Sequence, residues 1–332
     1  MKVRFGVDVL NNPQAWDSLD QIVDYFITGR HLWDINDVDD IENSDWIQED
    51  IDGRAGKRNL DTLQRCCTDS IYSPESRKHR MHTITLLVTF YGNSNNELMP
   101  DEAKRCLSEP AYVAVENQTS DGAFLDAMIH AFGRNQLRDA QTEGWWEYAH
   151  LGGFGEIEKR IEHIRAKTMG SLRILVVADS DRRYPDEVTP TICKVESYCD
   201  KVGDVPYVIL RKRKIENYLP ISTLWRVHVP KRFRNIYKAF VSLKPEQQDH
   251  YEIKTGFKKD KNGHAIVPKE QKALFQHVPR KILDDLCGGF GDEIWKFFES
   301  ARENITENAI RLTGFTDPDE IHRLLDWIEC QL

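Results

Sequence analysis

The sequence lacks any long apolar run. Its longest uncharged apolar stretch is residues 83–91 of a 332-residue chain. A transmembrane helix needs ~20 such residues. The N-terminal residues from Met1 to Phe5 do not begin an apolar signal region. Neither a membrane span nor export is expected, so the predicted location is the cytoplasm.

Cysteine pairs and nucleotide-binding loops are also missing. The seven cysteines are scattered, apart from the neighbours Cys66 and Cys67, and none belongs to a C-x-x-C motif. This spacing argues against a disulfide framework or a zinc site and favours reduced thiols. Without a G-x-x-x-x-G-K-[ST] segment, P-loop ATPase activity is not expected. A net charge of -9 disfavours a protein that coats nucleic acid indiscriminately.

Charge is distributed unevenly along the chain. Residues 1–60 carry 13 acidic and 6 basic residues, whereas residues 211–260 carry 13 basic and 5 acidic residues. A phosphate-backbone substrate would need such a basic segment, but a solvated face that pairs with acids elsewhere would look the same. The acidic segment could also dock on the basic one and inhibit it.

An acidic pair ends the clearest strand pattern. Residues 172–178 have the length and β-branched content of a buried strand, and Asp179 and Asp181 follow them. Because side chains alternate along a strand, both carboxylates are expected on one side. They would repel each other unless a proton or a cation lay between them. This favours Mg²⁺ or another hard cation, although a strand that runs into an acidic turn has the same pattern.

Strand and helix patterns alternate from residue 109 onward. Strands are expected at 111–115, 148–151, 172–178 and 207–210. Helices are expected between them, at 123–132, 156–167 and 191–202. The alternation predicts an α/β fold with a four-stranded parallel sheet flanked by helices. Ligands bind such sheets at the carboxyl ends of the strands, where Glu116, Asp179, Asp181 and the 211–217 segment fall.

Three domains are expected. Residues 1–108 form an N-terminal accessory domain of mixed α/β structure, and residues 109–222 form the catalytic domain. Residues 223–332 are expected to be mostly helical. The helical patterns in that last segment cover residues 273–286, 293–308 and 318–330.

Several motifs together resemble the TOPRIM domain of topoisomerases, DnaG-type primases and several nucleases. They are Glu116 after the first strand, a small-residue turn, the glycine-rich turn 152–155, and the Asp179/Asp181 pair. Residues 213–218, Arg-Lys-Ile-Glu-Asn-Tyr, resemble the basic IENY element of TOPRIM nucleases in the overcoming-lysogenization-defect (OLD) family and related phage-defence effectors. The sequence departs from the pattern at two positions. Asn117 stands where glycine is usual, and Asp121 comes one residue late.

The resemblance implies a Mg²⁺- or Mn²⁺-dependent nuclease of an anti-phage defence system. It implies that the metal is held by Glu116, Asp179, Asp181 and Glu216, with Asp121 as a further candidate. Several carboxylates in close range suit metal-assisted phosphodiester hydrolysis, and Glu116 could instead be the general acid or base. Candidates for holding phosphate are Arg211, Lys212, Arg213, Lys214 and Lys254, with Lys212 also a candidate for catalysis.

Other functions stay open. A DxD glycosyltransferase or a phosphatase also places acids after a strand, and a non-catalytic nucleic-acid-binding or regulatory subunit could retain a degenerate TOPRIM site. Because many proteins of this resemblance work with an ATPase, a separate ATPase or sensor subunit is an expected partner besides the nucleic acid. No membrane partner is expected, and a homo-oligomer is left open.

Overall fold

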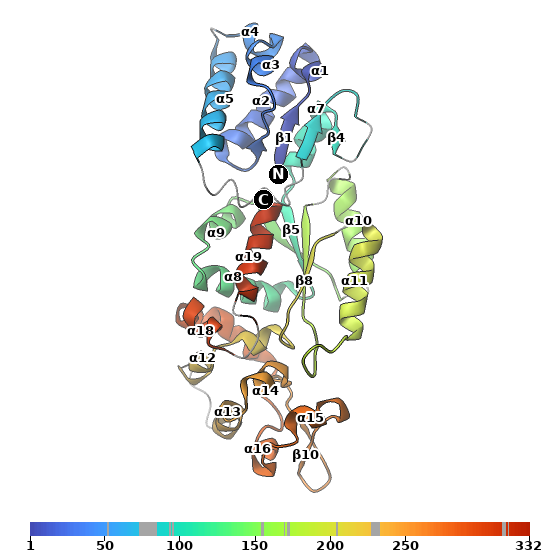
Figure 1. Ribbon diagram of the computed structural model, residues 1–332, viewed down its shortest axis with the longest axis vertical. Coiled ribbons are helices and arrows are strands. Elements are labelled where there is room, and N and C mark those ends of the chain that lie inside the picture. Colours follow the sequence, from blue (N-terminus) through green and yellow to red (C-terminus); the bar gives the residue numbers. More distant parts are fainter. Residues whose placement is uncertain are drawn as a thin grey trace.

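The computed structural model contains two four-stranded parallel sheets and a C-terminal region of short helices (Figure 1). No helix in the described residues has the length and apolarity needed to cross a membrane. The structure describes residues 1–51, 53–72, 85–92, 94, 96–153, 156–168, 170, 173–203, 205–226, 233–313, 317 and 319–332.

The first sheet is built by the N-terminal segment. Its strand order is β2-β1-β3-β4, with β1 (Lys2–Phe5), β2 (Leu32–Trp33), β3 (Thr85–Val88) and β4 (Glu97–Leu98). The surrounding helices are α1 (Val7–Leu10), α2 (Pro13–Thr28), α3 (Val38–Glu42), α4 (Asp45–Gln48), α5 (Arg54–Tyr72) and α7 (Pro100–Ser108). Buried aromatic rings of Phe5, Phe26, Trp33 and Trp46 contact one another in its core.

The second sheet confirms the predicted four-stranded parallel arrangement flanked by helices. Its order is β6-β5-β7-β8, with β5 (Ala111–Val115), β6 (Trp146–His150), β7 (Ile174–Ala178) and β8 (Tyr207–Ile209). Val113 of β5 pairs with Tyr148 of β6 and with Leu175 of β7. The strand β5 is therefore central, and β5 and β7 are neighbours.

Both faces of the second sheet are covered, which explains why its central strands are apolar throughout. Val113 and Leu175 face one core, whereas Ala114 and Val176 face the other. The first core is closed by α8 (Gln118–Ala131), α9 (Asn135–Thr142) and the last helix, α19 (Glu320–Gln331). The second is closed by α10 (Ile157–Lys167) and α11 (Pro190–Val202).

The C-terminal region is helical, but its helices are shorter than two of the sequence patterns predicted. A single helix at 273–286 is wrong because Pro279, with ψ 139°, separates α15 from α16. A single helix at 293–308 is wrong because Ile305 is extended. The elements between residues 221 and 311 include α12 (Ile221–Arg226), α13 (Arg234–Val241), α14 (Pro245–His250), α15 (Lys272–Phe275), α16 (Arg280–Asp285), α17 (Phe297–Ser300) and α18 (Glu307–Arg311).

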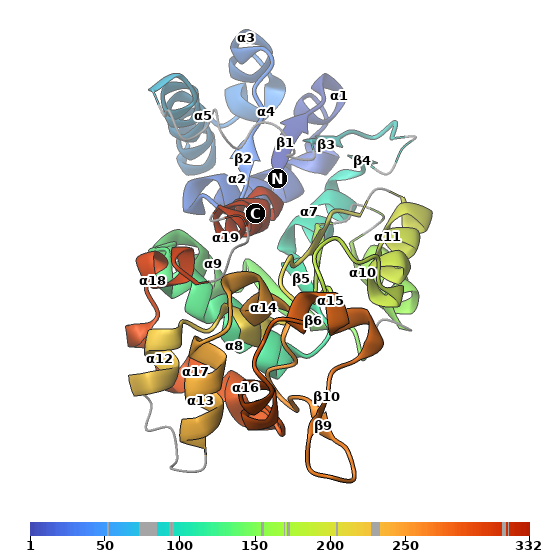
Figure 2. The same ribbon diagram turned by 60° about the horizontal axis from the view of Figure 1, so that its bottom comes forward.

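One hydrophobic cluster joins the second sheet to the C-terminal region. It extends in sequence from Ala111 to Ile328. The region also carries a small antiparallel hairpin of β9 (Lys258–Lys259) and β10 (Ala265–Ile266), which projects from the end of the molecule opposite the first sheet (Figures 1 and 2). The shared core holds the residues after β8 against the sheet edge where the candidate site lies.

Candidate active site

The candidate site lies at the carboxyl ends of β5 and β7. From β5 the chain continues to β6 on one side, and β7 and β8 lie on the other side of β5. The helices on the two sides belong to opposite faces of the sheet. Connections that diverge in this way leave a crevice outside the strand ends, where ligands of α/β sheets bind. Glu116 follows β5 directly and Asp179 follows β7, so both flank this point.

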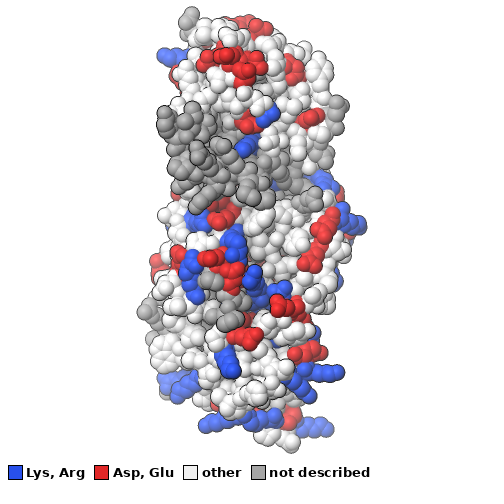
Figure 3. All heavy atoms as spheres, in the orientation of Figure 1, with Lys and Arg blue, Asp and Glu red and all other residues white. Residues whose placement is uncertain are grey.

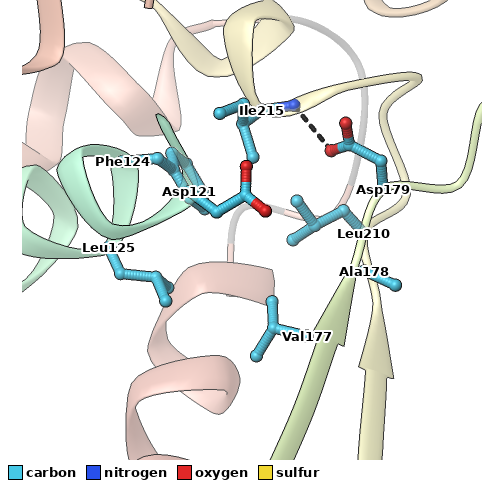
Figure 4. A pocket seen from close by; sticks show the side chains of 8 residues that line it. All are labelled: Asp121, Phe124, Leu125, Val177, Ala178, Asp179, Leu210 and Ile215. Atoms are coloured by element: carbon cyan, nitrogen blue, oxygen red, sulfur yellow. Dashed lines mark hydrogen bonds between the residues drawn. The ribbon is translucent and has the colours of Figure 1, made fainter. Parts of the chain in front are cut away.

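Asp179 links the end of β7 to the segment after β8. Its Oδ1 accepts a hydrogen bond from the backbone N–H of Ile215 at 2.8 Å. Ile215 begins the short 3₁₀ helix η2 (Ile215–Tyr218), which contains Glu216. Asp179 also lines a small pocket, into which the Asp121 carboxylate reaches from α8 (Figure 4). The structure thus brings together carboxylates that are 58 residues apart in sequence.

Asp181 does not follow the strand alternation that the sequence predicted, because β7 ends at Ala178. Its backbone is left-handed, with φ 54°, a conformation that costs a non-glycine residue about 1 kcal/mol. Thr191 donates its hydroxyl to the Asp181 carboxylate at 2.9 Å, and Lys214 Nζ lies 3.7 Å from it. The turn, not the pleat of a strand, orients this carboxylate.

Glu216 is the most buried acid of the site, with no exposed surface. Its Oε1 lies 2.7 Å from Nζ of Lys254, which comes from a loop 38 residues later in the chain. Among the described residues its Oε2 has no hydrogen-bond partner. A buried carboxylate oxygen without a donor is costly, and a bound cation would remove that cost.

Asp121 has a local role in its own helix. Asn117 is the N-cap of α8, and its side chain accepts hydrogen bonds from the backbone N–H groups of Thr119 and Ser120. In return, Asp121 accepts the backbone N–H of Asn117 at 2.9 Å. The helix therefore begins five residues before the predicted start at residue 123. Asp121 stabilises its first turn and also reaches the pocket opposite Asp179 (Figure 4).

Four acids of the site, Glu116, Asp121, Asp179 and Glu216, have a raised pKa. Burial is the largest cause in each case, and neighbouring carboxylates add to it at two of them. Asp121 and Asp181 raise the pKa of Glu116, and Asp121 and Glu216 raise the pKa of Asp179 well above its usual range. Burial also raises the pKa of Asp121 and of Glu216, which Lys254 partly opposes. A group of acids in this state favours a proton or a cation between them.

This electrostatic arrangement predicts a pH-dependent stability. A carboxyl whose pKa is raised by folding stabilises the fold at low pH, and that contribution is lost as pH rises from about 4 through the raised value. Replacing Asp179 with Asn removes one such group. The variant should therefore gain Tm relative to the unmodified protein by about 2–4 °C at pH 8 without metal, and little at pH 4.

Thermal unfolding followed by circular dichroism at both pH values measures this difference. Mg²⁺ should stabilise the unmodified protein more at pH 8 than at pH 4, and should stabilise the Asp179→Asn variant less. Equal Mg²⁺ shifts in the two proteins would contradict the assignment of Asp179 to a cation site.

The basic residues predicted to hold phosphate lie in different surroundings. Lys212 is buried, with Nζ 3.0 Å from Asp249 and hydrogen bonds to the backbone carbonyls of Asn217 and Thr313. A role in phosphate binding or catalysis does not fit this arrangement, because the ammonium group cannot reach solvent. We therefore leave Lys212 out of the proposed site.

The other basic residues predicted to hold phosphate also differ in burial and in their ion-pair partners. Arg213 Nη2 lies 2.7 Å from Glu252 and is mostly buried, whereas the more exposed Arg211 lies 3.6 Å from Asp317. Lys214 and Lys254 are the two predicted cations that contact the acids of the site. They lower the pKa of Glu116 and so partly offset the repulsion there.

Two acids that sequence reasoning missed support this arrangement. Asp249 pairs with Lys212, and Glu320, at the start of α19, accepts the hydroxyl of Tyr218 at 2.7 Å and the backbone N–H of Arg211 at 2.7 Å. Both acids come from segments with no motif of their own. They hold both ends of the 211–218 segment that carries Glu216.

The donor set suits a hard divalent cation, which prefers carboxylate oxygens. Across the described ranges, no three His, Cys, Asp or Glu side chains already form a metal-binding group. The orphaned Oε2 of Glu216 and the repulsion of Asp121 with Glu116 and with Asp179 are what a cation would relieve. The chemistry of these donor atoms therefore suits such a metal.

Acidic side chains gather over the N-terminal end of the molecule, whereas the β9–β10 hairpin lies at the opposite end (Figures 1 and 3). Autoinhibition by the N-terminal segment stays a prediction.

Comparison with models of protein families, with curated proteins and with solved structures found no match.

Proposed function

We propose that the protein is a metal-dependent nuclease of the TOPRIM type, acting in anti-phage defence with a separate ATPase or sensor subunit. One observation carries the hydrolytic part of this proposal. Carboxylates from β5, β7 and the segment after β8 meet at the carboxyl edge of a parallel sheet, beside Lys214 and Lys254. The defence role and the ATPase partner rest on the sequence resemblance alone.

The residues that would hold Mg²⁺ or Mn²⁺ are Asp179, Asp181, Glu116 and Glu216, with Asp121 beside them. Such a cation would supply activation of a water and neutralisation of charge on the leaving oxygen. Glu116 is the most accessible of these acids, and if it is not a ligand its raised pKa suits it to accept a proton from the attacking water. Lys214 and Lys254 place positive charge where non-bridging phosphate oxygens would lie.

A specific observation favours one alternative, a non-catalytic nucleic-acid-binding module. Glu216 is already paired with Lys254, Asp179 accepts the backbone N–H of Ile215, and Asp121 stabilises its own helix. A degenerate site would satisfy its acids internally in this way. This alternative predicts tight binding of nucleic acid without turnover.

Incubation with supercoiled plasmid and with tRNA tests the proposal. Cleavage should occur in Mg²⁺ or Mn²⁺ and stop in EDTA, and Glu116→Gln should lower the rate about 100-fold or more because it removes the proton acceptor. Glu299→Gln, on an exposed position of α17, should cleave like the unmodified protein. Binding of both nucleic acids with no cleavage in either metal would instead establish the non-catalytic module.

A further inference from the structure

A concentrated basic surface lies beyond the candidate site, at the end of the molecule that carries the β9–β10 hairpin. Residues 254–281 contain eight basic and two acidic residues. Six of the lysines are exposed, and within the described part of the chain none of them forms an ion pair: Lys258, Lys259, Lys261, Lys269, Lys272 and Lys281. Figure 3 shows basic side chains gathered at this end. We call these six residues the lysine surface.

The two acids of this segment do little to neutralise the lysine surface. Asp260 accepts backbone N–H groups of Asn262 and His264, which hold it in the turn of the hairpin. Glu270 pairs with Arg183, outside the surface, at 3.2 Å. Unpaired lysines gathered at one end of the molecule favour a polyanionic partner, because such a partner releases its counterions on binding.

The lysine surface is connected rigidly to the candidate site through Lys254. A Cβ on Gly256 would lie 2.2 Å from the carbonyl oxygen of Leu286, and one on Gly289 would lie 2.2 Å from that of Lys254. The two segments thus touch through their backbones, and the N–H of Gly291 donates to the Lys254 carbonyl at 2.9 Å. This contact fixes the base of the hairpin relative to Glu216, which Lys254 contacts.

The distance along the chain suits a nucleic acid that extends from the site. Lys258 is four positions after Lys254 in the chain, and this stretch can span at most about 14 Å. One strand of a duplex carries about four phosphates over that length. A strand positioned at the acids would therefore reach the hairpin with its flanking phosphates.

The segment that carries the lysine surface lacks the features of a single-strand binder. Proteins that hold single strands stack bases on exposed aromatic rings. The only Phe, Tyr or Trp residues between 254 and 281 are Phe257 and Phe275, and both are buried. Charge without stacking is the pattern of duplex binding through the phosphate backbone.

We propose that the lysine surface, with the β9–β10 hairpin at its centre, binds the phosphate backbone of a nucleic-acid duplex flanking the candidate site. The proposal rests on the proposed nuclease function for the choice of partner. It adds that the substrate is double-stranded and that affinity comes from lysines remote from the acids.

Binding in EDTA tests the proposal without requiring cleavage. A labelled duplex of about 20 base pairs and its single strand are titrated with full-length protein over a range of salt concentrations and followed by fluorescence anisotropy. Lys258→Ala/Lys259→Ala/Lys261→Ala should raise the duplex Kd about 10-fold and reduce the salt slope by about 2–3. The matched control, Lys159→Ala/Lys167→Ala/Lys194→Ala on α10 and α11, changes net charge equally and should leave both nearly unchanged.

Several outcomes would overturn the proposal: no duplex binding by the unmodified protein, equal losses in the two triple variants, or tighter binding of the single strand. The nuclease proposal is tested separately by turnover in Mg²⁺. A duplex affinity that depends on the hairpin, with no turnover, would contradict the nuclease proposal and support the proposal for the lysine surface. Turnover with a duplex affinity that does not depend on the hairpin would support the nuclease proposal and contradict the proposal for the lysine surface.

Discussion

Asp179→Asn should lower metal-dependent cleavage by about 10³-fold, equivalent to about 4 kcal/mol of transition-state stabilisation. Asp179 is the acid at the point where the connections of the sheet diverge, and its carboxylate lies among Asp121, Asp181 and Glu216. An amide has one oxygen fewer and no charge, so it holds a divalent cation poorly. It can still accept the N–H of Ile215, so the fold should be retained.

Two measurements separate loss of chemistry from loss of structure. Duplex affinity in EDTA should be equal or higher in Asp179→Asn, because a repulsive charge has been removed near the phosphate. Asp139→Asn, at an exposed position of α9, should cleave at the unmodified rate. If Asp179→Asn cleaves within a few-fold of the unmodified protein, the acids at this sheet edge are not the hydrolytic centre.

Lys212→Met should lower the free energy of unfolding by about 3–5 kcal/mol, because it leaves the carboxylate of Asp249 buried beside an apolar side chain. Lys214→Met, two positions along, should change stability by less than about 1 kcal/mol, since Lys214 is partly exposed and its partner lies at 3.7 Å. The second variant should nevertheless reduce cleavage about 10-fold or more. Of these two predicted phosphate-binding lysines, only Lys214 is thus expected to affect cleavage directly.

Urea denaturation and cleavage rates of both variants check this contrast. In a double-mutant cycle, adding Asp249→Asn to Lys212→Met should cost less than the two single changes together, because the pair is coupled. A Lys212→Met protein that is stable but has lost turnover would contradict this assignment and support a catalytic role for Lys212.

The parallel sheet and the position of its first acids follow from local sequence. Apolar runs at 111–115 and 174–178 and the intervening helices are recognised within windows of a few residues. Parallel strands end at one edge, so the placement of Glu116 and Asp179 at that edge needs no knowledge of distant contacts. The helix at residues 320–331 can likewise be recognised from the apolar spacing of its own sequence.

The predictions from sequence patterns were wrong where a single residue interrupts a regular strand or helix. Strand alternation was extended to Asp181, but the chain turns into a left-handed conformation there. Helical periodicity was extended through residue 279, but proline fixes its φ and removes its N–H, so the chain leaves the helix. In both cases one residue overrode the average tendency of its neighbours.

The sequence by itself determined a parallel α/β sheet with acids at one edge and an uneven division of charge along the chain. Only the tertiary structure decided which charged side chains are buried in ion pairs and which lie at the candidate site. Of two lysines in the 211–214 segment, Lys212 meets Asp249 in the interior, whereas Lys214 faces the acids at the edge. Ion pairing acts over a few ångströms, and the partners Lys254, Asp249 and Glu320 are brought within that range only when the C-terminal region packs against the sheet.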